Sequence, residues 1–79
     1  MISAFLFINT AFGFADDVVS ELNKISDIVE LYRVQGIYDI IAKVSSNTEE
    51  ELHDTIKNQI TKIDKITTTV TLIISKQQP

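Results

Sequence analysis

The apolar residues of this chain change their spacing several times, and this change restricts the fold more than any other feature. Four short segments alternate or are rich in β-branched residues, as strands are; they are residues 2–9, 28–35, 38–45 and 66–75. Two segments, 15–25 and 52–63, repeat apolar residues every three or four positions, as amphipathic helices do. The sequence therefore predicts the order β-α-β-β-α-β. With right-handed crossovers this order gives an α+β, ferredoxin-like sandwich, in which a four-stranded antiparallel sheet carries both helices on one face.

Turn and capping signals separate these segments. Gly36 lies between the second and third predicted strands, and the connection is so short that an antiparallel hairpin is expected. Thr48 and Glu51 fit the capping box that opens a helix. Acidic residues open both predicted helices, and Lys24 and Lys62 are expected in their last turns, as the helix dipole favours.

Length and charge restrict the function. The 79 residues are expected to form one domain at 1–75, followed by a polar tail at 76–79. A formal charge of −4 without a basic cluster argues against binding a nucleic-acid backbone, and the absence of cysteine excludes disulfides and thiolate metal sites. No segment approaches the roughly 20 apolar residues that span a bilayer, and no signal peptide is evident. We therefore expect a cytoplasmic protein with no direct nucleic-acid or membrane partner.

One face of the predicted sheet has no helix to cover it. Because Phe5 and Phe7 alternate with Leu6 and Ile8, one of these apolar pairs must lie on that face. The third and fourth strands divide their apolar residues in the same way. Soluble monomers rarely expose such a patch, so we expect a homodimer or a larger assembly. The alternative, a monomer whose tail covers the sheet, is disfavoured because the tail is short and polar.

Catalytic and metal-binding patterns are not found. The single histidine, His53, lies off the apolar stripe of its predicted helix, where we expect a solvated side chain rather than a ligand. No serine has the surroundings of a nucleophile, and two glycines cannot form a phosphate-binding loop. Phe5 and Phe7 lack the basic neighbours that an RNA-binding sheet needs. The sequence therefore predicts no catalytic residue, no metal and no cofactor.

One group of residues could bind a free amino acid. Such a ligand needs a carboxylate for its ammonium group and N–H or hydroxyl donors for its own carboxylate. Asp39, the backbone amides around Gly36 and the threonines of 67–71 could supply them. A simpler interpretation stays open, in which Gly36 makes a turn, Asp39 is solvated and the threonines are ordinary strand formers.

These residues also carry a resemblance to a known family. Residues 34–44, VQGIYDIIAKV, resemble the G-x-Y-D hairpin of the effector-binding (RAM) domain of the Lrp/AsnC regulators, and residues 63–73 are similar to that family's closing segment, although Lys65 replaces its usual glycine. The resemblance implies dimers formed through the sheets, rings of dimers such as octamers or decamers, and a small effector, typically an amino acid, held between dimers. Carried over by residue, the candidate ligand-binding residues are Gly36, Ile37, Tyr38, Asp39, Thr69 and Thr71.

Full-length members of this family carry an N-terminal helix-turn-helix domain, whereas the first predicted strand here begins at residue 2. We therefore expect a stand-alone amino-acid-sensing oligomerisation domain that modulates transcription regulation through its assembly or through full-length Lrp/AsnC partners. One alternative is a structural or interaction module that assembles without a ligand, which Lys65 in place of glycine favours. Another is a small ferredoxin-like monooxygenase or isomerase, which is disfavoured because Val, Leu and Ile fill the layer between sheet and helices.

Overall fold

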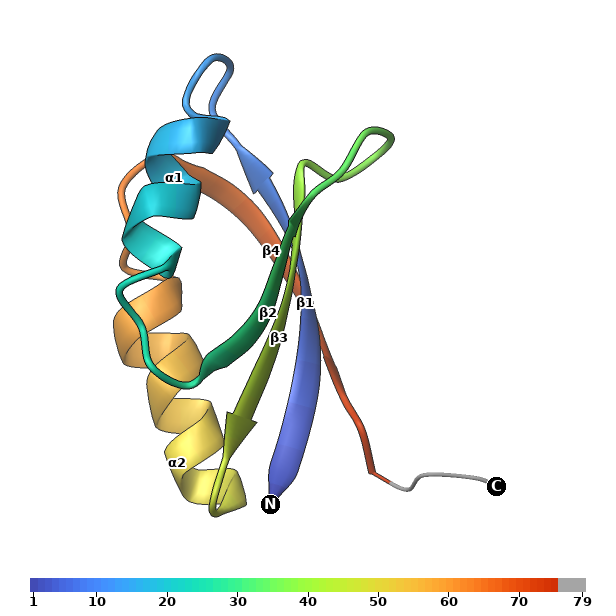
Figure 1. Cartoon of the computed structure of the whole chain (residues 1–79), viewed down its shortest axis with the longest axis vertical. Helices are drawn as coiled ribbons and strands as arrows, with labels where there is room; N and C mark the ends of the chain where they lie inside the picture. The colour runs from blue at the N-terminus through green and yellow to red at the C-terminus, as the bar shows by residue number, and fades with distance from the viewer. Residues whose placement is uncertain (76–79) are drawn as a thin grey trace.

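A computed structural model describes residues 1–75, and the predicted polar tail at 76–79 lies outside the described residues. Its elements are β1 (Ile2–Thr10), α1 (Ala15–Leu22), β2 (Ile28–Arg33), β3 (Ile40–Ser46), α2 (Glu49–Asp54), η1 (Thr55–Ile60) and β4 (Ile66–Ile73). Within the described range, the strands form one antiparallel sheet in the order β2-β3-β1-β4. The helices cover one face of this sheet (Figure 1). The predicted ferredoxin-like sandwich is thereby confirmed.

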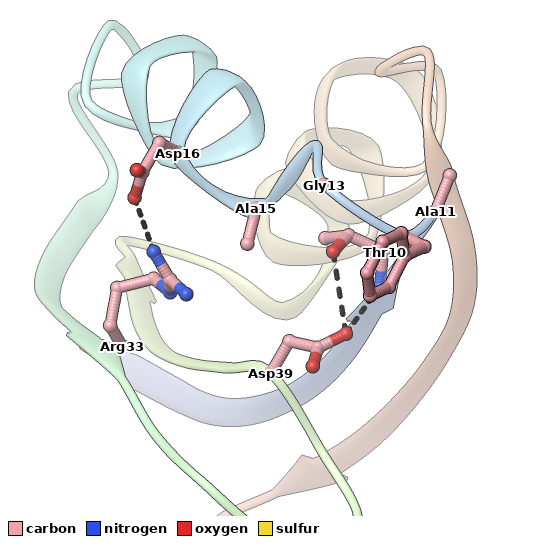
Figure 2. A pocket seen from close by; sticks show the side chains of 8 residues that line it. Thr10, Ala11, Gly13, Ala15, Asp16, Arg33 and Asp39 are labelled. Atoms are coloured by element: carbon pink, nitrogen blue, oxygen red, sulfur yellow. Dashed lines mark hydrogen bonds and ion pairs between the residues drawn. The ribbon is translucent and has the colours of Figure 1, made fainter.

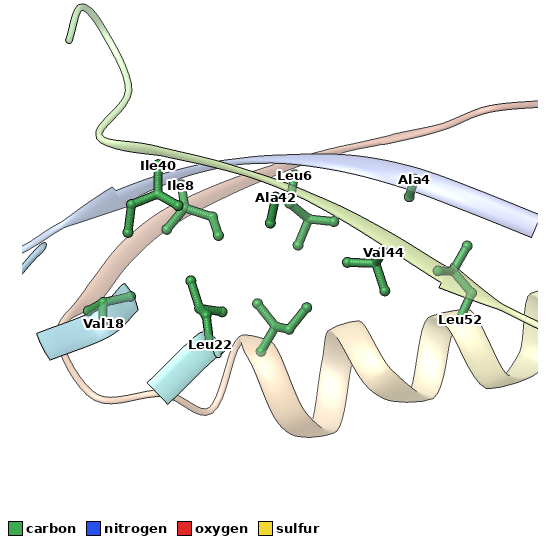
Figure 3. Packing of buried hydrophobic residues seen from close by; sticks show 10 residues of the cluster. Ala4, Leu6, Ile8, Val18, Leu22, Ile40, Ala42, Val44 and Leu52 are labelled. Carbon is green, nitrogen blue, oxygen red and sulfur yellow. The ribbon is translucent and has the colours of Figure 1, made fainter. Parts of the chain in front are cut away.

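The core fills the layer between the sheet and the helices (Figure 3). Leu6 pairs with Ala42, and Ile8 with Ile40, so the alternate residues of β1 and β3 point into the same layer. The buried apolar residues are Ala4, Leu6, Ile8, Val18, Leu22, Ile40, Ala42, Val44, Leu52 and Ile60. Burying each Leu or Ile side chain contributes about 1.5–3 kcal/mol. Phe5 and Phe7 consequently belong to the uncovered face, a choice that the sequence had left open.

The hairpin between β2 and β3 differs from the prediction. β2 ends at Arg33 and β3 begins at Ile40, so the connection is the loop 34–39 rather than a very short turn. The Val34 amide donates to the Asp39 carbonyl at 2.9 Å, which closes the loop at its base. Gly36 has a φ of 147° within it, a conformation that favours glycine.

The helices and the last strand are shorter than expected. α1 ends at Leu22, because the amides of Lys24 and Ile25 turn back to the carbonyls of Glu21 and Leu22 at 3.2 and 3.0 Å. Lys24 therefore lies beyond the last turn, where its ammonium pairs with Glu21 at 2.6 Å. Lys62 likewise lies beyond the end of η1, and β4 ends at Ile73 rather than at residue 75.

The second helix begins as the sequence predicts and then widens. The Glu51 amide donates to the Thr48 hydroxyl at 3.1 Å, so Thr48 is the N-cap. From Thr55 onward the helix is π-helical. The buried Thr55 hydroxyl donates to Asp27 Oδ2 at 2.8 Å, and the Ser46 hydroxyl donates to the same oxygen at 2.8 Å. Asp27 thus joins the turn before β2 to the end of β3 and to the widened helix. Within residues 1–75, no helix is long and apolar enough to cross a membrane.

Lys65 precedes β4 in a turn of the kind that glycine usually makes. Its φ is 76°, in the left-handed region. The Lys65 carbonyl accepts a hydrogen bond from the Ala11 amide at 2.8 Å, and its ammonium lies 4.6 Å from the centroid of the Phe14 ring. The lysine thus keeps a glycine-like backbone and ties the start of β4 to the loop between β1 and α1.

This geometry predicts opposite effects for two substitutions of Lys65. Lys65→Gly should raise the free energy of unfolding by about 0.5 kcal/mol, because it relieves about 1–2 kcal/mol of left-handed strain but loses a cation–π contact of about 0.5–1 kcal/mol. Lys65→Val should lower that free energy by about 2 kcal/mol, because a β-branched residue tolerates positive φ poorly. Urea denaturation measures both, with Lys62→Gly, at a position without positive φ, as the control. A glycine variant less stable than the valine variant would contradict the prediction.

Candidate functional site

Asp39 is held firmly where the hairpin loop meets the end of β1. Its backbone amide donates to the Ile8 carbonyl at 3.0 Å. Its carboxylate oxygen Oδ2 accepts hydrogen bonds from the amide and the hydroxyl of Thr10 at 2.9 and 3.3 Å. The side chain is half-buried, and among residues 1–75 no donor contacts the other oxygen, Oδ1. Asp39 is therefore a positioned carboxylate with one oxygen left to bind something else.

A recess of about 430 Å³ lies beside this carboxylate at one end of the sheet (Figure 2). Its lining residues are Thr10, Ala11, Phe12, Gly13, Ala15, Asp16, Arg33 and Asp39. Arg33, the last residue of β2, is paired across the hairpin with Ile40, so it lies close to Asp39. Its guanidinium forms an ion pair with Asp16 in the first turn of α1. The recess thus offers a carboxylate and a guanidinium from adjacent strands.

Three other predicted residues line a different recess, on the uncovered face of the sheet. Gly36, Ile37 and Tyr38 surround a largely apolar hollow of about 430 Å³, together with side chains of β1, β3 and β4. The Tyr38 ring lies 5.5 Å from the Phe7 ring, measured between centroids. Ile37, at the tip of the loop, is 85% exposed. This hollow has the character of an apolar contact surface rather than of a site for charged groups.

The two candidate threonines, Thr69 and Thr71, lie on a third surface, on β4. Thr69 pairs with Ile8 and Thr71 with Leu6, and paired residues share a face of the sheet. Both threonines are therefore on the helix side of β4, at the edge of the sheet, and neither lines the two recesses. Within one chain the six candidates are thus divided among three surfaces. Their role in ligand binding stays a prediction.

Sequence reasoning missed Arg33 and Thr10. The hairpin register could have indicated Arg33, because an antiparallel pair with a loop around Gly36 brings the end of one strand beside the start of the next. Nothing local marks Thr10, whose contact with Asp39 joins residues 29 positions apart. A hydrogen bond between residues so far apart in the chain leaves no signal in a single sequence.

The uncovered face is apolar at its centre and polar toward β2. Phe7 lies between Ile41 and Val70 in the register, and Phe5 lies between Lys43 and Leu72. The Lys43 ammonium is 5.7 Å from the centroid of the Phe5 ring. Farther out, Lys43 lies 3.7 Å from the Glu30 carboxylate. The face therefore combines a contiguous aromatic and aliphatic patch with a paired rim of charge.

Tyr32 completes this polar rim. Its hydroxyl donates to the Glu30 carboxylate at 2.7 Å. That hydrogen bond, together with the negative charge of Glu30, raises the pKa of Tyr32 above its usual value. Tyr32 therefore stays a neutral donor at physiological pH.

His53 is solvent-exposed, as predicted, and its Nε2 lies 3.5 Å from Glu49 on the same helix face. In the part of the chain that the structure describes, no group of three or more His, Cys, Asp or Glu side chains is arranged to hold a metal ion.

Comparison with known proteins matches nearly the whole chain to one family model, described as the Lrp/AsnC ligand binding domain, over residues 3–78. The regulatory protein AsnC of Haemophilus influenzae is 39% identical over 64 residues, which is 81% of this chain and 42% of that protein. The HTH-type transcriptional regulator FL11 of Pyrococcus furiosus is 33% identical over 75 residues, or 95% of this chain and 49% of that protein. The chain thus spans less than half the length of these two relatives.

The fold is similar to that of a solved protein of comparable size. The crystal structure of FFRP-DM1 superposes with a TM-score of 0.90 at 35% sequence identity, and the match covers 94% of this chain and 99% of that one.

Proposed function

Because this chain belongs to the Lrp/AsnC family, as a ligand-binding domain of the kind found in transcription regulators, we propose that it binds a small amino-acid effector and couples that binding to its assembly with further copies. Its relatives are regulators rather than enzymes. The effector and the assembly are the parts of this statement that go beyond family membership.

The observation that carries the proposal is the Asp39 carboxylate, in which Oδ2 accepts hydrogen bonds from Thr10 and Oδ1 has no hydrogen-bond donor among residues 1–75. Two hydrogen bonds from Thr10 fix Oδ2, and the Asp39 side chain lines the recess. An ammonium group bound there gains a charge-assisted hydrogen bond, which is stronger than a neutral one. Because the carboxylate is already positioned, little side-chain freedom is lost when the ligand binds. Asp39 is thus suited to recognise the amino group of an effector.

The uncovered sheet face supports association of copies. Its apolar centre of Phe5, Phe7, Ile41, Val70 and Leu72 is of the kind that protein interfaces bury. We propose that two copies pack through this face and that dimers assemble further into octamers or decamers. The candidates that one chain holds apart, at Gly36–Tyr38 and at Thr69 and Thr71, could then contribute to one effector site through contacts between copies. The proposal includes full-length Lrp/AsnC regulators as partners in mixed assemblies.

Coupling requires that the effector distinguish between assembled and dissociated states. A ligand shifts such an equilibrium only by its differential affinity for the two states. The effector would bind the assembled state more tightly if a neighbouring dimer completes the recess that one chain leaves open. The proposal therefore predicts that effector binding and assembly state change together.

A second function is favoured by one observation. The charged groups of the recess already have partners within the chain, since Arg33 pairs with Asp16 and Asp39 Oδ2 accepts from Thr10. In a module that assembles without any ligand, these internal contacts would suffice to pair the charged groups of the recess. It remains the alternative to amino-acid sensing.

Native mass spectrometry with and without a mixture of the twenty amino acids separates the two functions. Masses that are even multiples of the chain mass, with an amino-acid adduct and a ligand-dependent change in assembly, are expected for the sensor. His53→Ala, on the exposed face of α2, serves as a matched control that should behave as the wild type. An adduct-free assembly that no amino acid changes would overturn the sensor and support the ligand-independent module. A monomer under all conditions would contradict both.

A further inference from the structure

We infer that Arg33 binds the carboxylate of the effector and that Asp16 is an internal competitor, which occupies the Arg33 guanidinium until a ligand replaces it. The inference rests on the proposed function, because it concerns the recess beside Asp39. It adds the residue that binds the carboxylate end of the proposed amino acid and the ion pair that must break when that molecule binds.

Arg33 and Asp39 both line the same recess, in which Arg33 is paired with Asp16 and Asp39 with Thr10 (Figure 2). The register of the hairpin fixes this arrangement, because Arg33 is opposite Ile40 and Asp39 immediately precedes it. Ala15 lies between Arg33 and Asp39 in the view of Figure 2, and neither it nor the nearby Gly13 has a side chain that extends beyond Cβ. A small ligand can therefore reach the guanidinium and the carboxylate at the same time.

The ion pair between Arg33 and Asp16 is suited to exchange. The Asp16 side chain is 90% exposed and that of Arg33 is 50% exposed, so water competes with the pair. Exposed pairs of this kind contribute little to stability. A guanidinium also presents five donors in a planar fork, which can bind an incoming carboxylate in a bidentate manner. A ligand carboxylate can thus replace that of Asp16 at small cost.

The balance of charges in the recess sets the ligand class. Its charged side chains are two carboxylates, Asp16 and Asp39, and one guanidinium, Arg33. A carboxylic acid without an amino group would pair with Arg33 but leave Asp39 without a cation. An amine without a carboxylate would pair with Asp39 but would leave the ion pair between Arg33 and Asp16 in place. A zwitterionic α-amino acid satisfies both ends, so it should bind more tightly than either analogue.

Isothermal titration of each of the twenty amino acids, followed by analogues of the tightest one, tests this selection without altering the protein. The analogues are the matching amine, which lacks the carboxylate, and the matching carboxylic acid, which lacks the amino group. Each should bind about 10- to 100-fold more weakly than the amino acid, because each loses one charge-assisted contact. An amine that binds as tightly as the amino acid would overturn the inference.

Two variants test the roles assigned to Arg33 and Asp16. Arg33→Gln should weaken binding of the tightest amino acid by about 10- to 100-fold, and should leave its amine analogue nearly unaffected. Asp16→Asn should tighten binding of the amino acid by about twofold to fivefold at low salt, because the competitor is removed. Unchanged thermal unfolding of each variant shows that the fold is intact. A weaker Asp16→Asn variant would overturn the competition and leave Asp16 as a positioning residue for Arg33.

The comparison with Asp39→Asn distinguishes the failure of this inference from the failure of the proposed function. If Asp39→Asn loses binding and Arg33→Gln keeps it, the effector site stands and the role of Arg33 is wrong. If no amino acid binds the wild type, or if both variants bind as the wild type does, the proposed function fails and this inference fails with it.

Discussion

Replacing Phe7 with aspartate is expected to abolish the proposed dimer and leave monomers. Phe7 lies at the centre of the uncovered sheet face, between Ile41 on β3 and Val70 on β4, and its ring neighbours that of Tyr38. Central aromatic residues of an interface commonly contribute 2 kcal/mol or more to binding, and a buried carboxylate without a partner adds a desolvation cost. The dimer dissociation constant should therefore rise by at least about 100-fold. Sedimentation equilibrium over a range of concentrations measures it.

Phe12→Asp is the matched control for this experiment. Phe12 is a fully exposed phenylalanine in the loop between β1 and α1, so the same change is made away from the sheet face. Phe12→Asp should retain the dimer. Because Phe7 points away from the core, circular dichroism of Phe7→Asp should still show a folded chain. A Phe7→Asp variant that remains dimeric, or a Phe12→Asp variant that dissociates, would place the dimer contact somewhere other than the sheet face.

The architecture of the domain could be predicted from the sequence because each element carries its own periodicity. The β-branched run of β4 and the stripe of Leu52 and Ile60 on the second helix are local patterns that survive in the structure. Local patterns do not, however, decide which side of β1 faces the helices. Phe5 and Phe7 are as apolar as Leu6 and Ile8, and only the contact with α1, α2 and η1 selects the aliphatic pair for the core.

The ends of the elements were less predictable because tertiary contacts set them. The Val34 amide donates to the Asp39 carbonyl, one step beyond the last paired residues Arg33 and Ile40, and closes the loop 34–39, which leaves both strands shorter than strand propensity suggests. The carbonyls of Glu21 and Leu22 capture the next amides and end α1 before Lys24. The helix ends where bonds to the third preceding residue replace the regular ones, the hairpin ends where its loop begins, and residue type alone indicates neither position.

The candidate site was predicted in its residue types but not in its geometry. Asp39 was identified because its carboxylate suits an ammonium group, yet the loop turns Gly36–Tyr38 toward the uncovered face and leaves Asp39 at the end of the sheet. Arg33 escaped notice because it belongs to the preceding strand, and it reaches the recess only through the pairing of β2 with β3. A site assembled across strands depends on register, which short sequence motifs do not contain.

Asp39→Asn is expected to weaken amino-acid binding by about 10- to 100-fold while leaving the domain folded. The amide keeps an oxygen that can accept from the Thr10 backbone, at the position where the carboxylate oxygen lies 2.9 Å from that nitrogen. What it loses is the negative charge that an ammonium group needs. Titration calorimetry measures the affinity, and thermal unfolding monitored by circular dichroism measures the fold.

Thr10→Ala distinguishes the negative charge of the Asp39 carboxylate from its positioning by Thr10. It removes the hydroxyl contact at 3.3 Å but keeps the charge and the backbone hydrogen bond, so we expect binding within about threefold of the wild type and a loss of stability of about 0.5–1 kcal/mol. If Thr10→Ala weakens binding as much as Asp39→Asn does, positioning of the carboxylate matters more than its charge. If Asp39→Asn binds amino acids as tightly as the wild type, Asp39 does not recognise the ammonium group. The effector, if one binds, would then be held by Arg33 or by residues of a neighbouring copy.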